Sequence, residues 1–130
     1  MTDLEILERS FRPLELPERG YGTTCAKCGT EICGVYILVD EDEIVYVGSS
    51  VNIHRRVYAQ KREKSFERAL FLALPRKVIR RYEAALIRGL SPEDNVVIPG
   101  IDDAYDAEIL YGLGLRDTLT EDDIVWQEVA

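Results

Sequence analysis

The chain of 130 residues has little of several residue types, with one histidine, one tryptophan and three cysteines. Three cysteines cannot build a framework of several disulfides. No stretch approaches the roughly 18 uninterrupted apolar residues of a membrane-spanning helix. Residues 1–5 are acidic and lack the basic and apolar regions of a signal peptide. These absences predict a cytoplasmic protein with no membrane partner.

The cysteines leave one alternative open, a zinc site. Cys25 and Cys28 have the spacing of half a zinc-binding motif, and Cys33 and His54 are the remaining candidate ligands. The sequence contains no second Cys-x-x-Cys pair, and His54 is its only histidine. We therefore expect reduced thiols rather than zinc at Cys25, Cys28 and Cys33.

The charge is strongly uneven along the chain. The net charge of −8 by itself disfavours a nucleic-acid partner, but residues 51–90 hold 11 of the 16 basic residues and 3 of the 24 acidic ones. Residues 1–50 carry a net −6 and residues 91–130 a net −10. A basic segment between acidic flanks can still bind phosphates, although such side chains often only solvate helices. If nucleic acid binds, the affinity should depend strongly on salt.

Local patterns predict a β-hairpin followed by a helix. Residues 34–39 and 44–48 are rich in Val, Ile and Tyr, and the four acidic residues 40–43 between them are typical of a turn. Asn52 and the serines before it are candidate caps for a helix over residues 52–62.

A strand and a long helix are predicted next. Residues 69–74 form a short apolar run stopped by Pro75, which favours a buried strand. Over residues 76–90 apolar side chains recur every three or four positions, which predicts a helix ending near Gly89 and Pro92.

The ends of the chain show weaker signals. Thr2 and Glu5 form a capping box, which predicts a helix over residues 3–10, and an irregular stretch then runs to about residue 30. The sequence at 120–123 is suited to capping a last helix or turn.

Together these elements predict a small α/β (α+β) domain. A hydrophobic content of 46% is enough for a single core. We expect a mainly antiparallel sheet of about three strands flanked by helices. The predicted extents are one domain over 1–130, with a core over 33–96, an N-terminal extension over 1–32 and an acidic C-terminal extension over 97–130.

Glu83 is the most informative single residue. It lies four positions after Ile79 and four before Ile87, within the apolar stripe of the predicted helix. A carboxylate in such a place is costly unless it binds a cation or a charged partner. One interpretation is a metal ligand for one Mg²⁺ (or Mn²⁺) ion, which keeps several waters and needs few protein ligands. The alternative is an ion pair with Arg56 across the core, or with Arg80, which we expect on a different face of the helix.

Arg56 is a candidate phosphate ligand. It lies one turn after Asn52 on the helix that follows the hairpin. A guanidinium can form two parallel hydrogen bonds to phosphate oxygens and offset the charge that develops there. Arg55 points about 100° away on a helix, so we expect it to face solvent or a DNA backbone.

Two tyrosines lie on the predicted hairpin strands. Whether Tyr36 and Tyr46 share a face depends on the turn between them: a turn of three or five residues places both rings on one face, and a turn of two or four places them on opposite faces. The sequence leaves the choice open. Gly48 ends the second strand, where the missing side chain lets the backbone approach a ligand.

These motifs, in this order, resemble the GIY-YIG nuclease superfamily. Gly34-Val35-Tyr36 and Tyr46-Val47-Gly48 correspond to the two tripeptides, and Arg56, Glu83 and Asn95 follow in the family's order. The resemblance covers about half of the chain. The residues between Gln60 and Glu83 are few, which implies that the middle helix of many members is reduced or absent.

The resemblance implies a function and a set of site residues. Tyr36, Tyr46, Arg56 and Glu83 would be catalytic, with Glu83 as the ligand of one divalent metal ion. Tyr36 would activate or orient the attacking water, and Asn95 would be structural. Gly48, Asn52 and Arg55 would be substrate-binding residues.

The resulting hypothesis is a hydrolase: a metal-dependent endonuclease that cleaves nucleic-acid, expected to be DNA, phosphodiester bonds. One alternative is a catalytically idle nuclease fold that binds a protein partner through the acidic termini. Another is an unrelated domain in which Glu83 and Arg56 form a buried ion pair. Binding of a divalent ion at Glu83 would separate the hypothesis from both alternatives.

Overall fold

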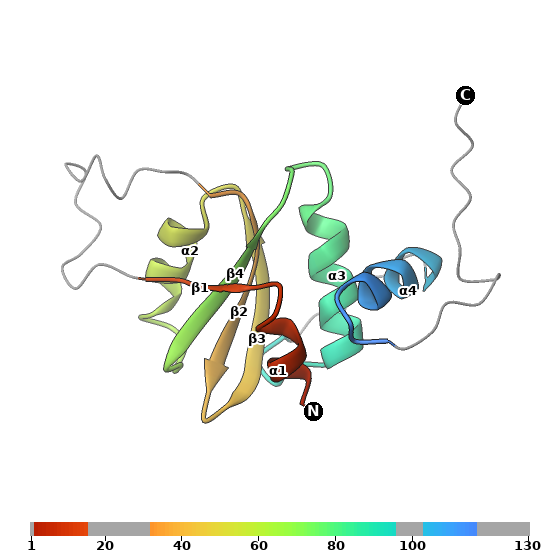
Figure 1. The fold of residues 1–130 in the computed structure, drawn as a ribbon. Helices are drawn as coiled ribbons and strands as arrows, with labels where there is room; N and C mark the ends of the chain where they lie inside the picture. The colour runs from red at the N-terminus through yellow and green to blue at the C-terminus, as the bar shows by residue number, and fades with distance from the viewer. Residues whose placement is uncertain (1, 16–31, 96–102, 117–130) are drawn as a thin grey trace.

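The computed structural model describes residues 2–15, 32–95 and 103–116 (Figure 1). Its secondary structure contains both helices and strands. The elements in chain order are α1 (Asp3–Leu7), β1 (Arg12–Pro13), β2 (Gly34–Asp40), β3 (Glu43–Ser50), α2 (Ile53–Gln60), β4 (Arg68–Ala73), α3 (Ile79–Leu90) and α4 (Asp103–Gly112).

The strands form one antiparallel sheet in the order β1-β4-β2-β3. The predicted number of three strands is wrong, because the sheet has four. The additional strand, β1, has only two residues, one of them Pro13, and pairs with Leu70 and Phe71 of β4. A strand this short shows no alternation of apolar and polar residues, and proline is tolerated there because β1 lies at the edge of the sheet.

The hairpin between β2 and β3 contains an irregularity that the sequence did not reveal. Asp40 pairs with Glu43, so the turn has two residues, and both turn residues have positive φ (51° for Glu41 and 60° for Asp42), as a type I′ turn requires. The register then shifts, because Val39 pairs with Ile44 but Leu38 pairs with Tyr46. Val45 is therefore an extra residue, a β-bulge.

This bulge overturns the predicted rule that only an odd turn places the tyrosines on one face. A regular two-residue turn would have put Tyr36 and Tyr46 on opposite faces. The extra residue restores the alternation, so that Tyr36 pairs with Gly48 and Leu38 pairs with Tyr46. Both tyrosines consequently lie on the same face of the sheet.

Helices α1 and α2 begin where the capping signals predict, and all three predicted helices are shorter than expected. The Thr2 hydroxyl accepts from the Glu5 backbone N–H, and Asn52 caps α2 by accepting from the Arg55 N–H. Helix α3 begins at Ile79 rather than at residue 76, and it continues through Gly89 to end at Ser91, which adopts a left-handed conformation (φ 47°). Helix α4 was not predicted, because its acidic sequence has no apolar periodicity.

The sheet separates two hydrophobic layers. Helix α2 lies against one face, and α1, α3 and α4 lie on the other (Figure 1). Strand β2 supplies both layers through its alternating side chains. Val35, Ile37 and Val39 face the layer with α1 and α3, whereas Tyr36 and Leu38 face α2.

Residues on both sides of the predicted 33–96 core take part in this packing. Leu4, Leu7 and Phe11 come from the predicted N-terminal extension, and Leu113 comes from the C-terminal one. They bury their side chains against α3 and the sheet.

Three further points concern the sequence predictions. Among the described residues, no helix is long and apolar enough to cross a bilayer. Cys33 is a half-buried free thiol, while Cys25, Cys28 and the predicted cap at 120–123 lie outside the described residues. The expectation of reduced thiols rather than zinc is therefore not tested at Cys25 and Cys28.

Candidate functional site

A cavity of about 540 Å³ lies where β2, β3, α2 and α3 meet. Four of its lining residues are those predicted to be catalytic, Tyr36, Tyr46, Arg56 and Glu83. Its other lining residues are Ser49, Arg80 and Ala84. The fold thus brings together four predicted residues that are spread over 48 positions of the chain, from 36 to 83.

Tyr36 and Gly48 are paired across the hairpin, and the tyrosine ring lies directly over the glycine. A Cβ atom at position 48 would overlap the Cζ and hydroxyl oxygen of Tyr36. The glycine therefore allows the ring to cross β3 and carry its hydroxyl to the cavity, although the residue as a whole is only 1% exposed. Gly48 thus contributes to the site by packing closely against Tyr36, not by contacting a ligand.

The hydroxyl of Tyr36 is tightly held. It donates a hydrogen bond of 2.6 Å to the side-chain Oε1 of Gln60, the last residue of α2. Burial raises the pKa of Tyr36 above its usual value of 10, and the neighbouring Tyr46 and Glu83 act in the same direction. The charge and hydrogen bond of Arg56 oppose this rise in pKa. Tyr36 therefore remains a neutral phenol near pH 7.

Tyr46 lies beside Tyr36, with the two ring centroids 6.2 Å apart. The Lys64 ammonium lies over the Tyr46 ring. Its Nζ is 4.4 Å from the ring centroid, a distance typical of a cation–π contact. Lys64 follows α2 in the chain, so this contact links the end of α2 to β3 beside the cavity.

Glu83 reaches the cavity from α3. Its Oε2 accepts a hydrogen bond of 2.6 Å from the hydroxyl of Ser49, on β3. The neighbours Ala84 and Ile87 are buried, while Glu83 itself is half-buried. Within residues 32–95, no ion pair joins Glu83 to an arginine. The alternative of a buried Glu83–Arg56 ion pair is therefore wrong.

Two arginines complete the cavity. Arg56 comes from α2 and Arg80 from α3, and both side chains are exposed. The prediction that Arg80 lies on a different face from Glu83 is wrong, because both residues line the same cavity. Residues three apart on a helix are neighbours, and this spacing is the sequence signal that would have identified Arg80.

Sequence reasoning also missed Ser49 and Gln60. Both are polar side chains near strand or helix ends, and serine at such a place is usually interpreted as a cap. Their contacts with Glu83 and Tyr36 join segments 34 and 24 residues apart, which no local pattern can indicate.

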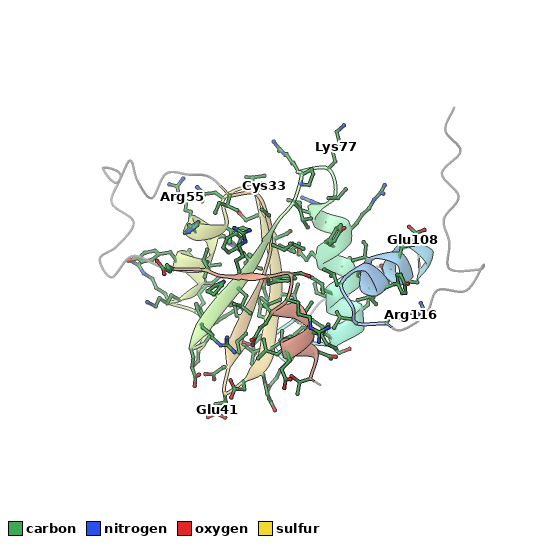
Figure 2. The ribbon with its side chains drawn as sticks, in the orientation of Figure 1. Cys33, Glu41, Arg55, Lys77, Glu108 and Arg116 are labelled. Atoms are coloured by element: carbon green, nitrogen blue, oxygen red, sulfur yellow. The ribbon has the colours of Figure 1, made fainter. Side chains whose placement is uncertain are left out.

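None of the three predicted substrate-binding residues lines the cavity: Gly48 lies beneath the Tyr36 ring, and Asn52 and Arg55 lie elsewhere. Asn52 is the N-cap of α2, with its Oδ1 3.2 Å from the Arg55 backbone nitrogen. The Arg55 side chain is exposed and lines a separate surface depression with Tyr58 and Arg62. Figure 2 shows Arg55 projecting outward from the end of α2. Arg55 therefore takes no part in the cavity with Tyr36 and Glu83.

Asn95 closes the exposed edge of β3. Its side-chain amide accepts from the Val47 N–H (2.9 Å) and donates to the Val47 carbonyl (3.0 Å). The backbone N–H of Asp94 donates to the carbonyl of Val45, the extra residue of the bulge (2.9 Å). The segment after α3 thus satisfies backbone groups of β3 that no strand pairs, as expected of a structural asparagine.

Three charged side chains mark opposite ends of the molecule. Arg55 and Lys77 lie at one end of the molecule, and Glu41 of the hairpin turn lies at the other (Figure 2). A second cavity of about 390 Å³ lies at the hairpin end and is lined in part by Asp3, Asp42 and Glu93. The cavity with Tyr36 and Glu83 has Arg56 and Arg80 instead, and is the one suited to an anion.

The donor set is compatible with a single hard cation. The described residues contain no group of three or more His, Cys, Asp and Glu side chains placed to hold a metal ion. The Glu83 carboxylate is a hard oxygen ligand fixed by Ser49 at the wall of an open cavity. A magnesium ion there would take its remaining ligands from water and from a substrate phosphate.

No protein-family model, no curated protein and no solved structure matches the chain significantly.

Proposed function

We propose that the protein is a metal-dependent endonuclease that hydrolyses phosphodiester bonds of nucleic acid, with DNA as the expected substrate. The observation that carries the proposal is the cavity that unites Tyr36, Tyr46, Arg56 and Glu83. Two cations and one fixed carboxylate around a neutral phenol are groups suited to binding and cleaving a phosphodiester.

Each group has a defined part in this proposal. Arg56 and Arg80 bind the phosphate oxygens and offset the negative charge that grows on them. Glu83, oriented by Ser49, holds one Mg²⁺ or Mn²⁺ ion. When bound, the metal ion would polarise the phosphate and lower the pKa of a bound water. Tyr36 directs a hydrogen-bonding oxygen into the same space.

We further propose that the domain has a fold of the GIY-YIG type. Gly34-Val35-Tyr36 and Tyr46-Val47-Gly48 lie on neighbouring antiparallel strands, with Tyr36 paired to Gly48. The hairpin is followed by a helix bearing Arg56, then by a strand and by a helix bearing Glu83. This order and pairing support the family assignment.

A cleavage assay tests the proposed function. Supercoiled plasmid and branched DNA are incubated with the protein and Mg²⁺ or Mn²⁺, with a chelator in parallel. The expected result is nicking or cutting that requires the metal and is lost in Glu83→Gln. Cleavage that persists in the chelator, or is equal in the variant, would contradict the proposal because contaminating nuclease or another site would explain it.

A catalytically idle binding module is the second candidate. The acidic surface at the hairpin end, with Asp3, Asp42 and Glu93 around a cavity, favours it because such a surface suits a basic protein segment. A module of this kind does not need a divalent ion at Glu83. Mn²⁺ is titrated into the wild type and into Glu83→Gln, and binding is measured from the relaxation rate of water protons. Binding that is lost in the variant favours the nuclease over the binding module.

A further inference from the structure

Gln60 is a buried polar residue beside the proposed catalytic phenol. It is 2% exposed and ends helix α2. Burying an amide is costly unless it forms hydrogen bonds, and the Oε1 of Gln60 accepts one of 2.6 Å from the Tyr36 hydroxyl. Both residues are almost fully buried, so little bulk water competes for this hydrogen bond.

The backbone of Gln60 is fixed at the end of α2. The N–H groups of Glu63 and Lys64 both donate to the Gln60 carbonyl, at 3.0 and 2.9 Å. Arg56 lies four positions earlier on α2, and residues four apart lie on the same helical face. Helix α2 therefore presents a hydrogen-bond acceptor and a cation to the same phenol.

A phenol has one O–H donor and lone pairs that accept. In Tyr36 the proton is directed to Gln60, so only the lone pairs remain for other partners. The Arg56 guanidinium interacts with the same oxygen through its positive charge and a hydrogen bond. The Tyr36 oxygen can therefore only accept hydrogen bonds within the cavity.

We propose that Gln60 is a positioning residue of the site: it holds the Tyr36 proton away from the cavity, so that the phenolic oxygen accepts a hydrogen bond from the attacking water. This role rests on the proposed nuclease function. Tyr36 orients the water and takes no proton from it. The pKa of Tyr36, raised by burial with Tyr46 on β3 and Glu83 on α3 and opposed by Arg56 on α2, is consistent with a phenol that stays neutral.

The hydrogen bond is tested first without any substrate. In proton NMR spectra, the Tyr36 hydroxyl should give a resonance protected from exchange with water, assigned by its absence in Tyr36→Phe. The signal should vanish in Gln60→Leu and persist in Gln60→Glu, which keeps an acceptor. An unchanged signal in Gln60→Leu would show that another group takes the proton, and would overturn the role of Gln60.

The effect on catalysis is tested by a double-mutant cycle. Gln60→Leu should lower kcat for metal-dependent plasmid cleavage by up to about 100-fold with KM unchanged, because only the orientation of a bound water is lost. Gln60→Glu should restore most of the rate. In the Tyr36→Phe background, Gln60→Leu should cause no further loss, because there is no hydroxyl left to position.

Three outcomes overturn the proposal. They are a wild-type kcat in Gln60→Leu, a change confined to KM, and an equal loss of rate with and without the Tyr36 hydroxyl. If Gln60→Leu does not fold, Gln60→Met fills a similar volume without an amide and replaces it. A wild-type protein that does not cleave would reject the nuclease function itself, whereas the NMR result concerns Gln60 alone.

Discussion

The ring of Tyr36 lies on the backbone of Gly48, its partner across the β2–β3 hairpin, and fills the space that a side chain at position 48 would occupy. Tyr36 is only 1% exposed and its hydroxyl is bonded to Gln60, so a side chain at position 48 would have to displace a ring that is held in place. The identity of residue 48 therefore controls where the Tyr36 hydroxyl lies.

Gly48→Ala should consequently reduce both stability and activity. Overpacking of a buried position typically costs about 1–3 kcal/mol in the free energy of unfolding. Displacement of the Tyr36 hydroxyl should also lower the cleavage rate. Urea denaturation and a plasmid assay measure the two effects. Gly112→Ala is the matched control, because a Cβ there meets no atom within 4 Å. Equal stability of the two alanine variants would contradict the close packing of Tyr36 on Gly48.

Glu83→Gln should abolish metal-dependent cleavage and leave the fold intact. Glutamine keeps the oxygen that accepts from Ser49 but loses the charge that holds a hard cation. Ser49→Ala should be milder, with a loss of about 10- to 100-fold in activity or metal affinity, because it removes only the group that orients the ligand. Calorimetric Mg²⁺ titration and single-turnover cleavage provide the measurements. Cleavage by Glu83→Gln at the wild-type rate would be incompatible with a metal ligand at this position.

Arg56→Lys should be nearly as damaging as Arg56→Ala. Lysine keeps the charge but lacks the planar fork that forms two parallel bonds to a phosphate. Loss of one such transition-state contact typically costs on the order of 100-fold or more in rate. Arg55→Lys is the control and should be mild, because Arg55 lies outside the cavity. The same loss of kcat in both lysine variants would show that Arg56 is not the phosphate ligand.

Asn95→Ala should destabilise the fold by about 1–3 kcal/mol, because it leaves the part-buried N–H and C=O of Val47 without their partner. Asn95→Asp should be no better, since a carboxylate cannot donate to the Val47 carbonyl. Asp94→Ala is the control, because Asp94 contacts β3 through its backbone N–H. Chemical denaturation of the three variants checks the order. An Asn95→Asp variant as stable as the wild type would refute the two-way pairing.

His54 should make stability depend on pH. Burial lowers its pKa below 6.5, and within the described residues its Nδ1 is buried without a hydrogen-bond partner. The unfolded chain therefore binds a proton more readily than the folded one, so this contribution to stability is complete above about pH 6.5 and is lost as the pH falls toward the folded-state pKa. Denaturation of the wild type and His54→Gln between pH 5 and 7 should show a smaller decline in the variant. Parallel curves would exclude His54 as the cause.

Local sequence was sufficient for most of the elements and for the principal candidates of the site. The richness of residues 34–39 in Val, Ile and Tyr predicted β2, and the four-residue recurrence through Val78 and Leu86 predicted most of α3. Such patterns work because backbone hydrogen bonding and burial act over one or two turns of chain. The position of Glu83 within the apolar stripe of a helix likewise identified it as a candidate site residue.

The features that sequence could not determine all depend on contacts between distant segments. The two-residue strand β1 exists because β4 offers it an edge, and α4 packs although its own sequence has no apolar periodicity. The bulge at Val45 is stabilised in part by Asp94, 49 positions later.

The sequence by itself determined the local elements and the identity of Tyr36, Tyr46, Arg56 and Glu83 as candidates. Only the tertiary structure decided that they share a cavity, because one extra residue in β3 sets which face Tyr46 occupies. It also decided which groups hold them, since Gln60 and Ser49 meet Tyr36 and Glu83 only after α2 and α3 pack on the sheet. Short-range preferences fix the backbone locally, whereas the geometry of a site is set by long-range packing, which a linear pattern does not encode.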